Sequence, residues 1–119
     1  MPKSFQLIEE KFSEKDKEWQ WTYKLAFTFN YQLITNITIT DHWQKKPGRE
    51  MITNELICEI LEKKLNQQKV NPMPDSYLLW KKDIFSWRTT YQGKNYRLFF
   101  WFKNGTTNHL WIKNIHPID

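Results

Sequence analysis

The sequence predicts an α+β fold in which an antiparallel sheet packs on one main helix. Three observations lead to this prediction: two runs in the first 40 residues alternate apolar and polar residues, one amphipathic segment follows, and three strand-like runs close the chain. Period-two alternation is typical of half-buried strands, and apolar residues at helical spacing are typical of a helix lying on a sheet. We therefore expect an N-terminal hairpin and a C-terminal three-stranded meander on that helix.

Size and composition indicate one small basic domain. A chain of 119 residues can bury one core, so we expect a single domain over residues 1–119. Aromatic residues make up 17% of the chain, which argues against disorder and predicts a core built from rings. The formal net charge of +5 favours an anionic partner: nucleic acid first, an acidic protein second and a membrane surface last.

Cysteine content and hydropathy indicate a cytoplasmic protein. A single cysteine, Cys58, excludes an intramolecular disulfide and a cysteine-built zinc site, and it fits a reducing compartment. No run approaches the roughly 20 apolar residues of a membrane span, and the N-terminus lacks the apolar core of a signal peptide. We expect no membrane association.

The first 40 residues carry the strand patterns. Residues 5–10 form a short strand candidate, and the mixed-charge run 11–18 is typical of a solvated loop or a turn of helix. Apolar residues then occupy every odd position from Trp19 to Tyr31, which predicts a long half-buried strand. A second alternating run covers 33–40. The two runs either pair as a hairpin or form one bent strand, since no glycine marks a turn.

The middle of the chain contains the helix. Thr53 suits the N-cap position, and Leu56, Ile57, Ile60, Leu61 and Leu65 recur at helical spacing, which predicts about four turns. The cationic, Pro-Gly-containing segment 41–49 before it is expected to be a loop. The two prolines in 71–75 end the helix, and 77–80 is expected to form a short edge segment.

The C-terminal stretch 84–119 is the expected meander, with joints at Gly93-Lys94 and Asn104-Gly105. The middle run 96–102 is interrupted only by Arg97, so it should be the central strand. Burying an unpaired guanidinium is costly. Either Arg97 meets an acid, such as Asp83 or Glu59, or one face of the sheet is open to an anionic ligand.

Strand register decides whether the basic residues share a face. If Gly93-Lys94 is a two-residue loop, Arg88 pairs with Phe99 and Thr90 with Arg97, and both arginines lie on one face. For the next hairpin, a two- or four-residue loop puts Leu110 and Ile112 on that face. A three-residue loop instead puts there His109, Trp111 and Lys113. Only this last register makes one continuous cationic patch.

A cationic patch with exposed rings suits RNA. Phosphates would meet Arg and Lys, and bases could stack on Trp101 or Trp111. RNA can also be cut without a metal, because a guanidinium can stabilise the phosphorane and a histidine can transfer the proton. Arg97 and His116 fit this division of labour. The sequence has no GxSxG, HExxH or glycine-rich phosphate loop, and its three scattered histidines support a metal site only weakly, so no cofactor is expected.

These residues resemble a known family. The segments Trp87-Arg88, 96–100 and 110–115, followed by His116, look like the C-terminal sheet of RelE/YoeB-type toxins of bacterial toxin–antitoxin systems. The resemblance implies a small basic ribonuclease, usually ribosome-dependent, that an acidic antitoxin protein inhibits. It also implies that Arg97 stabilises the transition-state phosphate, that His116 is the acid or base, and that Arg88 and Lys113 hold RNA. The long aromatic hairpin and the lack of a terminal Tyr depart from the family pattern.

Further candidates lie in segment 41–49. His42 beside Asp41 is either a carboxylate-oriented catalytic base or the neighbour of a capping Asp. Lys46 and Arg49 either contact RNA or belong to a solvated loop. The alternative function is a non-catalytic domain that binds nucleic acid or an acidic protein through its cationic sheet face, with Arg97 structural and His116 an ordinary surface histidine.

Overall fold

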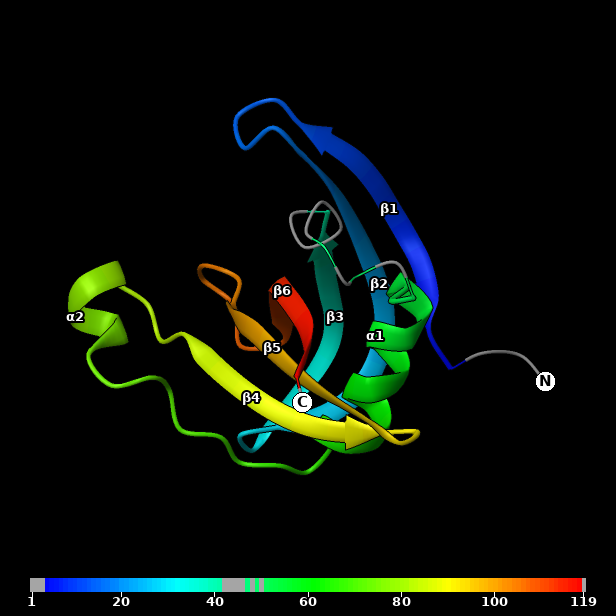
Figure 1. Cartoon of the computed structure of the whole chain (residues 1–119). Coiled ribbons are helices and arrows are strands. Elements are labelled where there is room, and N and C mark those ends of the chain that lie inside the picture. The colour runs from blue at the N-terminus through cyan, green and yellow to red at the C-terminus, as the bar shows by residue number, and fades with distance from the viewer. Residues whose placement is uncertain (1–3, 42–46, 48, 50, 119) are drawn as a thin grey trace.

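The computed structural model describes residues 4–41, 47, 49 and 51–118. Six strands form one sheet in the order β1-β2-β3-β6-β5-β4 (Figure 1). The strands are β1 (Gln6–Ser13), β2 (Glu18–Phe29), β3 (Gln32–Thr40), β4 (Phe85–Tyr91), β5 (Lys94–Phe102) and β6 (His109–Ile118). The helical elements are α1 (Asn54–Ile60), its π-helical continuation η2 (Leu61–Leu65) and α2 (Ser76–Trp80).

The predicted fold class, an antiparallel sheet on one main helix, is wrong. The sheet is mixed, because β3 and β6 pair in parallel with Ile37 opposite Leu110. This parallel pair joins the first three strands to the last three and makes the sheet the dominant element, with short helical pieces beside it. Alternation along a strand reports which side chains are buried but not which edges meet, so the sequence pattern could not predict this pairing.

The helix is shorter and less regular than four α-turns. The Thr53 hydroxyl accepts a hydrogen bond from the Leu56 amide at 3.1 Å, as predicted for an N-cap. After seven residues, α1 changes to π geometry, and the chain leaves the helix at Asn66. Backbone contacts with β2 explain this end, because the amide of Gln67 donates to the carbonyl of Thr28 at 2.7 Å.

A hairpin joins β2 and β3 without glycine. Asn30 and Tyr31 both have positive φ, 49° and 64°, which is the backbone of a type I′ turn. The Asn30 side chain is held by Val70: its Nδ2 donates to the Val70 carbonyl, and its Oδ1 accepts from the Val70 amide at 2.7 Å. Asn tolerates this conformation, and these bonds fix it. Tyr31 was expected in the core but is 82% exposed at the turn.

The N-terminal edge differs from the prediction. The run 11–18, expected as a loop or helical turn, continues β1 to Ser13, turns, and starts β2 at Glu18. On this hairpin the rings of Phe12 and Trp19 meet edge to face at 5.6 Å and stay partly exposed. Trp19 therefore does not join the core, because it lies near the turn of a hairpin at the edge of the sheet, where the side chains stay in solvent.

The core lies between one face of the sheet and α1–η2. Fully buried members of both elements include Phe29, Phe100, Ile37, Ile57 and Leu61. The ring of Phe29 lies 5.1 Å from that of Phe85 and 5.4 Å from that of Phe100, so three strands share one aromatic cluster. This arrangement leaves the second face of the sheet, here called the outer face, without a covering helix among the described residues.

Segment 77–80 is helical rather than an edge segment. It forms α2, which stands beside the start of β4 and away from α1 (Figure 1). Its apolar side chains are exposed: Tyr77, Leu78, Leu79 and Trp80. No helix in the described part of the chain is long and apolar enough to cross a membrane.

Candidate nucleic-acid interface

The last three strands place three predicted site residues in one row. The β4–β5 turn is Gln92-Gly93, with positive φ at both residues, rather than Gly93-Lys94. Arg88 consequently lies opposite Arg97 and not opposite Phe99. The prediction that both arginines share a face is nevertheless correct. On the other side of β5, Arg97 lies opposite His116 of β6.

The second hairpin has the register that makes one patch. Trp101 lies opposite Trp111, so His109 and Trp111 share the face of Arg97. The connection, residues 103–108, is longer than each of the two-, three- and four-residue alternatives, and its register has the parity of the three-residue one. Two hydrogen bonds of Thr106 to the carbonyls of Lys103 and His109 close this connection.

A β-bulge in β6 brings His116 onto the same face. Phe100 lies opposite Ile112 and Phe99 opposite Asn114, so Lys113 is the extra residue. Without this residue, Arg97 would lie opposite Ile115, and His116 would point toward the helix. The bulge therefore sends Ile115 into the core and His116 to the outer face, as bulges do where they redirect a side chain.

Arg97 has an unmet hydrogen-bonding group. Its Nε atom is buried and has no hydrogen-bond partner among the described residues, and the same holds for Oδ1 of Asn114. Neither acid proposed as its structural partner pairs with it: no ion pair in the described ranges joins Arg97 to Asp83 or Glu59. Glu59 accepts a bond from the hydroxyl of Tyr91 instead. Buried groups without partners are rare in native proteins and call for an explanation such as a ligand.

His116 is held by a ring contact. Its imidazole stacks on Phe99, with ring centroids 6.1 Å apart and planes 23° apart. Phe99 is half-buried on β5, two positions from Arg97. This contact holds the imidazole on the face of the sheet that also carries Arg97.

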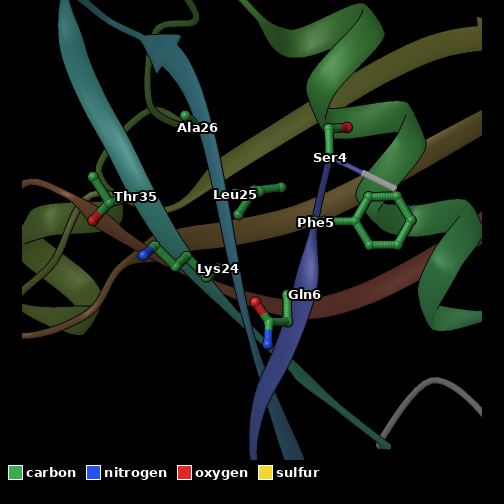
Figure 2. A pocket seen from close by; sticks show the side chains of 7 residues that line it. All are labelled: Ser4, Phe5, Gln6, Lys24, Leu25, Ala26 and Thr35. Atoms are coloured by element: carbon green, nitrogen blue, oxygen red, sulfur yellow. The ribbon is translucent and has the colours of Figure 1, made fainter. Parts of the chain in front are cut away.

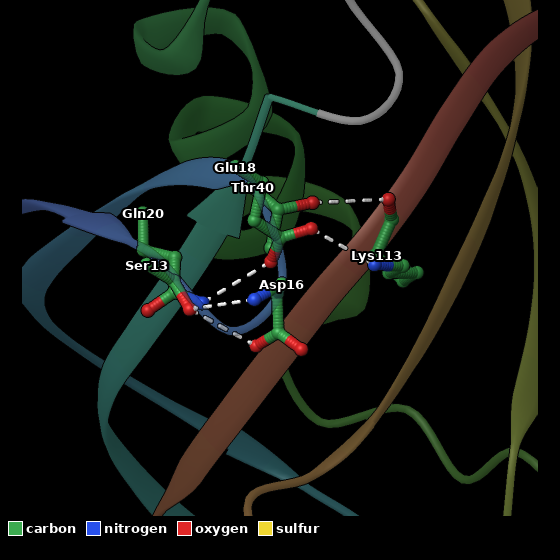
Figure 3. Close-up of polar contacts among 6 residues, drawn as sticks. All are labelled: Ser13, Asp16, Glu18, Gln20, Thr40 and Lys113. Carbon is green, nitrogen blue, oxygen red and sulfur yellow. Dashed lines mark hydrogen bonds and ion pairs between the residues drawn. The ribbon is translucent and has the colours of Figure 1, made fainter.

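Lys113 has a structural contact rather than a free ammonium. Its Nζ lies 3.0 Å from a carboxylate oxygen of the buried Glu18, which also accepts from Gln20 (Figure 3). The hydroxyl of Thr40 donates to the Lys113 carbonyl at 3.3 Å. The Glu18 contact links the start of β2 to β6 on the outer face, and the Thr40 contact links β3 to β6. Lys113 therefore contributes less free charge for RNA than the sequence suggested.

His109 is also engaged. Its Nε2 lies 2.7 Å from the hydroxyl of Thr38, which in turn bonds the hydroxyl of Thr22 at 2.8 Å. Burial lowers the pKa of His109, and the nearby ammonium of Lys103 lowers it further, against a smaller opposing effect of Glu9. A neutral imidazole in a hydroxyl network is a poor phosphate-binding cation near neutral pH.

The remaining predicted residues fall into three cases. Arg88 is exposed on β4 and available to a ligand. Arg49 supports the fold, because its Nε donates to the Ile115 carbonyl at 2.9 Å and its Nη1 to the Pro47 carbonyl at 2.8 Å. His42 and Lys46 lie outside the described residues.

Sequence reasoning missed two lysines at this face. Lys82 follows α2 and places its Nζ 4.2 Å from the ring centroid of Trp101, and Lys103 follows β5. Both line a pocket with Trp101 and Trp111. Nothing in the local pattern marks Lys82, because its contact with Trp101 depends on how α2 leads into β4.

A second pocket lies near the N-terminus (Figure 2). It is lined by Ser4, Phe5, Gln6, Lys24, Leu25, Ala26 and Thr35. Lys24 is its one charged lining residue, and none of the predicted site residues reaches it. It lacks the paired groups that acid–base chemistry would need.

In comparisons with known proteins, no family model, no curated protein and no solved structure matches the chain. The resemblance to RelE/YoeB-type toxins therefore remains a prediction. In the part of the chain that the structure describes, no three His, Cys, Asp or Glu side chains gather as a metal site.

Proposed function

We propose that this protein targets RNA and cleaves it as a metal-independent endoribonuclease of the RelE-like kind. The observation that carries the proposal is the pairing of Arg97 with His116 on the outer face. The half-buried side chain of Arg97 supports it, because a guanidinium suits phosphate oxygens. Arg88, opposite Arg97 and exposed, provides a second guanidinium for a neighbouring phosphate.

The chemistry follows from these groups. The ribose 2′-oxygen attacks the adjacent phosphorus and loses its proton, the phosphorus–5′-oxygen bond breaks, and the 5′-oxygen gains a proton. The products are a 2′,3′-cyclic phosphate and a 5′-hydroxyl. Arg97 stabilises the charge of the phosphorane, and His116 carries one of the two proton transfers, with water carrying the other. No redox step or external co-reactant is required.

The setting proposed for this activity is the cytoplasm, with messenger RNA as substrate, on or off the ribosome. A small acidic protein would be its inhibitor. The net charge of +5 and the exposed guanidinium of Arg88 support an anionic partner. The exposed apolar side chains of α2 provide a surface that such an inhibitor could cover.

The test is an RNA-cleavage assay in chelator, with and without ribosomes. We expect wild type to cleave and both Arg97→Ala and His116→Ala to lose at least about 100-fold in rate, which is typical of a lost acid–base or charge-stabilising group. Thr90→Ala, an exposed change on β4, is the matched control and should keep full activity. Retained activity in both site variants, with unchanged circular dichroism, would overturn these roles.

A second candidate is binding without cleavage. The half-buried rings of Phe99, Trp101 and Trp111 beside Arg88 favour it, because stacking and phosphate contacts suffice for binding single-stranded RNA. This candidate predicts salt-dependent binding that Arg88→Glu weakens, with no product in the cleavage assay. Cleavage by wild type would exclude it.

A further inference from the structure

A pocket on the outer face joins the second half of the meander to the tip of the β1–β2 hairpin. Its floor is the cross-strand pair Trp101 and Trp111, both half-buried. Its rim includes Lys82, Lys103 and Asn104, and the hairpin contributes residues 15, 16 and 18. The cavity has a volume of about 430 Å³, which is within the range of small-molecule sites.

The side chains of this pocket suit a nucleotide. The two indole rings offer stacking surfaces, the ammonium groups of Lys82 and Lys103 suit a phosphate, and the amide of Asn104 can donate to and accept from a base edge. Glu18 is paired with Lys113, whereas Asp16 accepts from the Ser13 hydroxyl and keeps its charge. The lining still favours an anion, because it has four lysines against two carboxylates.

We propose that this pocket binds one base of the RNA, stacked on the Trp101–Trp111 pair, at a fixed distance from the bond that is cut. The inference rests on the proposed function only for the position of the phosphate at which the RNA is cut. Binding of the base does not depend on cleavage. Trp101 lies four residues from Arg97 on β5, a distance of about 13 Å along the strand. An extended single strand covers this distance with roughly two nucleotides.

Lys82 controls access to the stacking surface. Its ammonium lies over the ring of Trp101 at 4.2 Å from the centroid, a cation–π contact that shields the ring. An entering base takes the place of this ammonium, and the flexible Lys82 side chain then reaches the phosphate of the same nucleotide. Lys82→Ala consequently removes both the cover and one phosphate contact, so it should reduce the salt dependence of binding.

The experiment uses a fluorescently labelled, 2′-O-methyl hexanucleotide, which cannot be cleaved by attack of the 2′-oxygen. Its binding to the full chain is measured by anisotropy. We expect Trp101→Leu and Trp111→Leu to weaken binding by roughly 5- to 100-fold, the effect of losing one stacked base, and Trp101→Phe to weaken it less than either. Trp80→Leu on α2 is the matched control, because that indole is exposed and outside the pocket.

A scan with one abasic nucleotide at each position locates the bound base. We expect one position to weaken wild-type binding, and the same substitution to have no further effect in Trp101→Leu. Unchanged binding in both Trp→Leu variants overturns the base site, even if cleavage is observed. Loss of binding in these variants without any cleavage by wild type keeps the base site and overturns the ribonuclease. No binding of RNA by wild type overturns both.

Discussion

Arg97 of β5 and His116 of β6 lie opposite each other because a single extra residue, Lys113, bulges out of β6. The same bulge places Ile115 in the core, so packing energy fixes the register that brings the two polar groups together. A pair whose geometry is set by core packing is rigid before any ligand arrives. This relationship is the basis for proposing chemistry at the outer face.

The contact between Glu18 and Lys113 should contribute to stability. Glu18→Ala leaves the Lys113 ammonium and the Gln20 amide without their acceptor, so we expect a loss of about 1–3 kcal/mol in the free energy of unfolding. Urea denaturation would measure it. Glu14→Ala, which removes an exposed ion pair with Lys17, should change stability by less than about 0.5 kcal/mol. Equal effects of the two substitutions would contradict a fastening role for Glu18.

His109 should make the fold less stable in mild acid. Its pKa is lowered by burial, so below its usual value near 6.5 the unfolded state binds a proton that the folded state resists. Stability therefore falls as the pH decreases through about 6.5, until the lowered folded pKa is passed. His109→Gln should flatten this part of the profile in urea unfolding between roughly pH 5 and 7.5. An NMR titration in which the pKa of His109 lies at or above its ordinary value would contradict the prediction.

Cys58 should be unreactive in the native protein. Its side chain is buried in the core, burial raises the pKa of the thiol, and the carboxylates of Glu62 and Glu55 raise it further. Since the thiolate is the reactive form, an aromatic disulfide reagent should label Cys58 only as fast as the chain opens, and should label it rapidly in urea. Fast stoichiometric labelling of the folded protein would show that this face of α1 is not packed in the core.

The apolar side chains of α2 should contribute little to folding. Leu78 and Leu79 are 73% and 71% exposed, so the double substitution of both to Ser should leave the free energy of unfolding within about 0.5 kcal/mol of wild type. The buried Leu98 is the comparison, since Leu98→Ala should cost about 2–5 kcal/mol. A large loss in the α2 variant would mean that these leucines pack in solution and are not a free surface.

Local patterns in the sequence were enough for several elements but not for their assembly. The N-cap at Thr53 and the shared face of Arg88 and Arg97 follow from local chemistry and from parity. The hairpin at Asn30 forms without the usual glycine because contacts with Val70 stabilise the turn. The roles of Lys113 and His109 were overestimated, since a count of charges does not include the partners that fold against them.

The sequence by itself determined the shared face of Arg88 and Arg97 and the start of α1 after its Thr53 cap, because these depend on residues a few positions apart. The predicted ring-built core was wrong, since Ile and Leu outnumber aromatic residues among its buried members. Only the tertiary structure decided that β6 runs parallel beside β3, and that the Trp101–Trp111 pocket meets the β1–β2 hairpin. Those contacts join segments far apart in the chain, and their energies depend on how well the complete surfaces of the two segments fit together. The sequence of one strand does not specify which distant strand it will pair with.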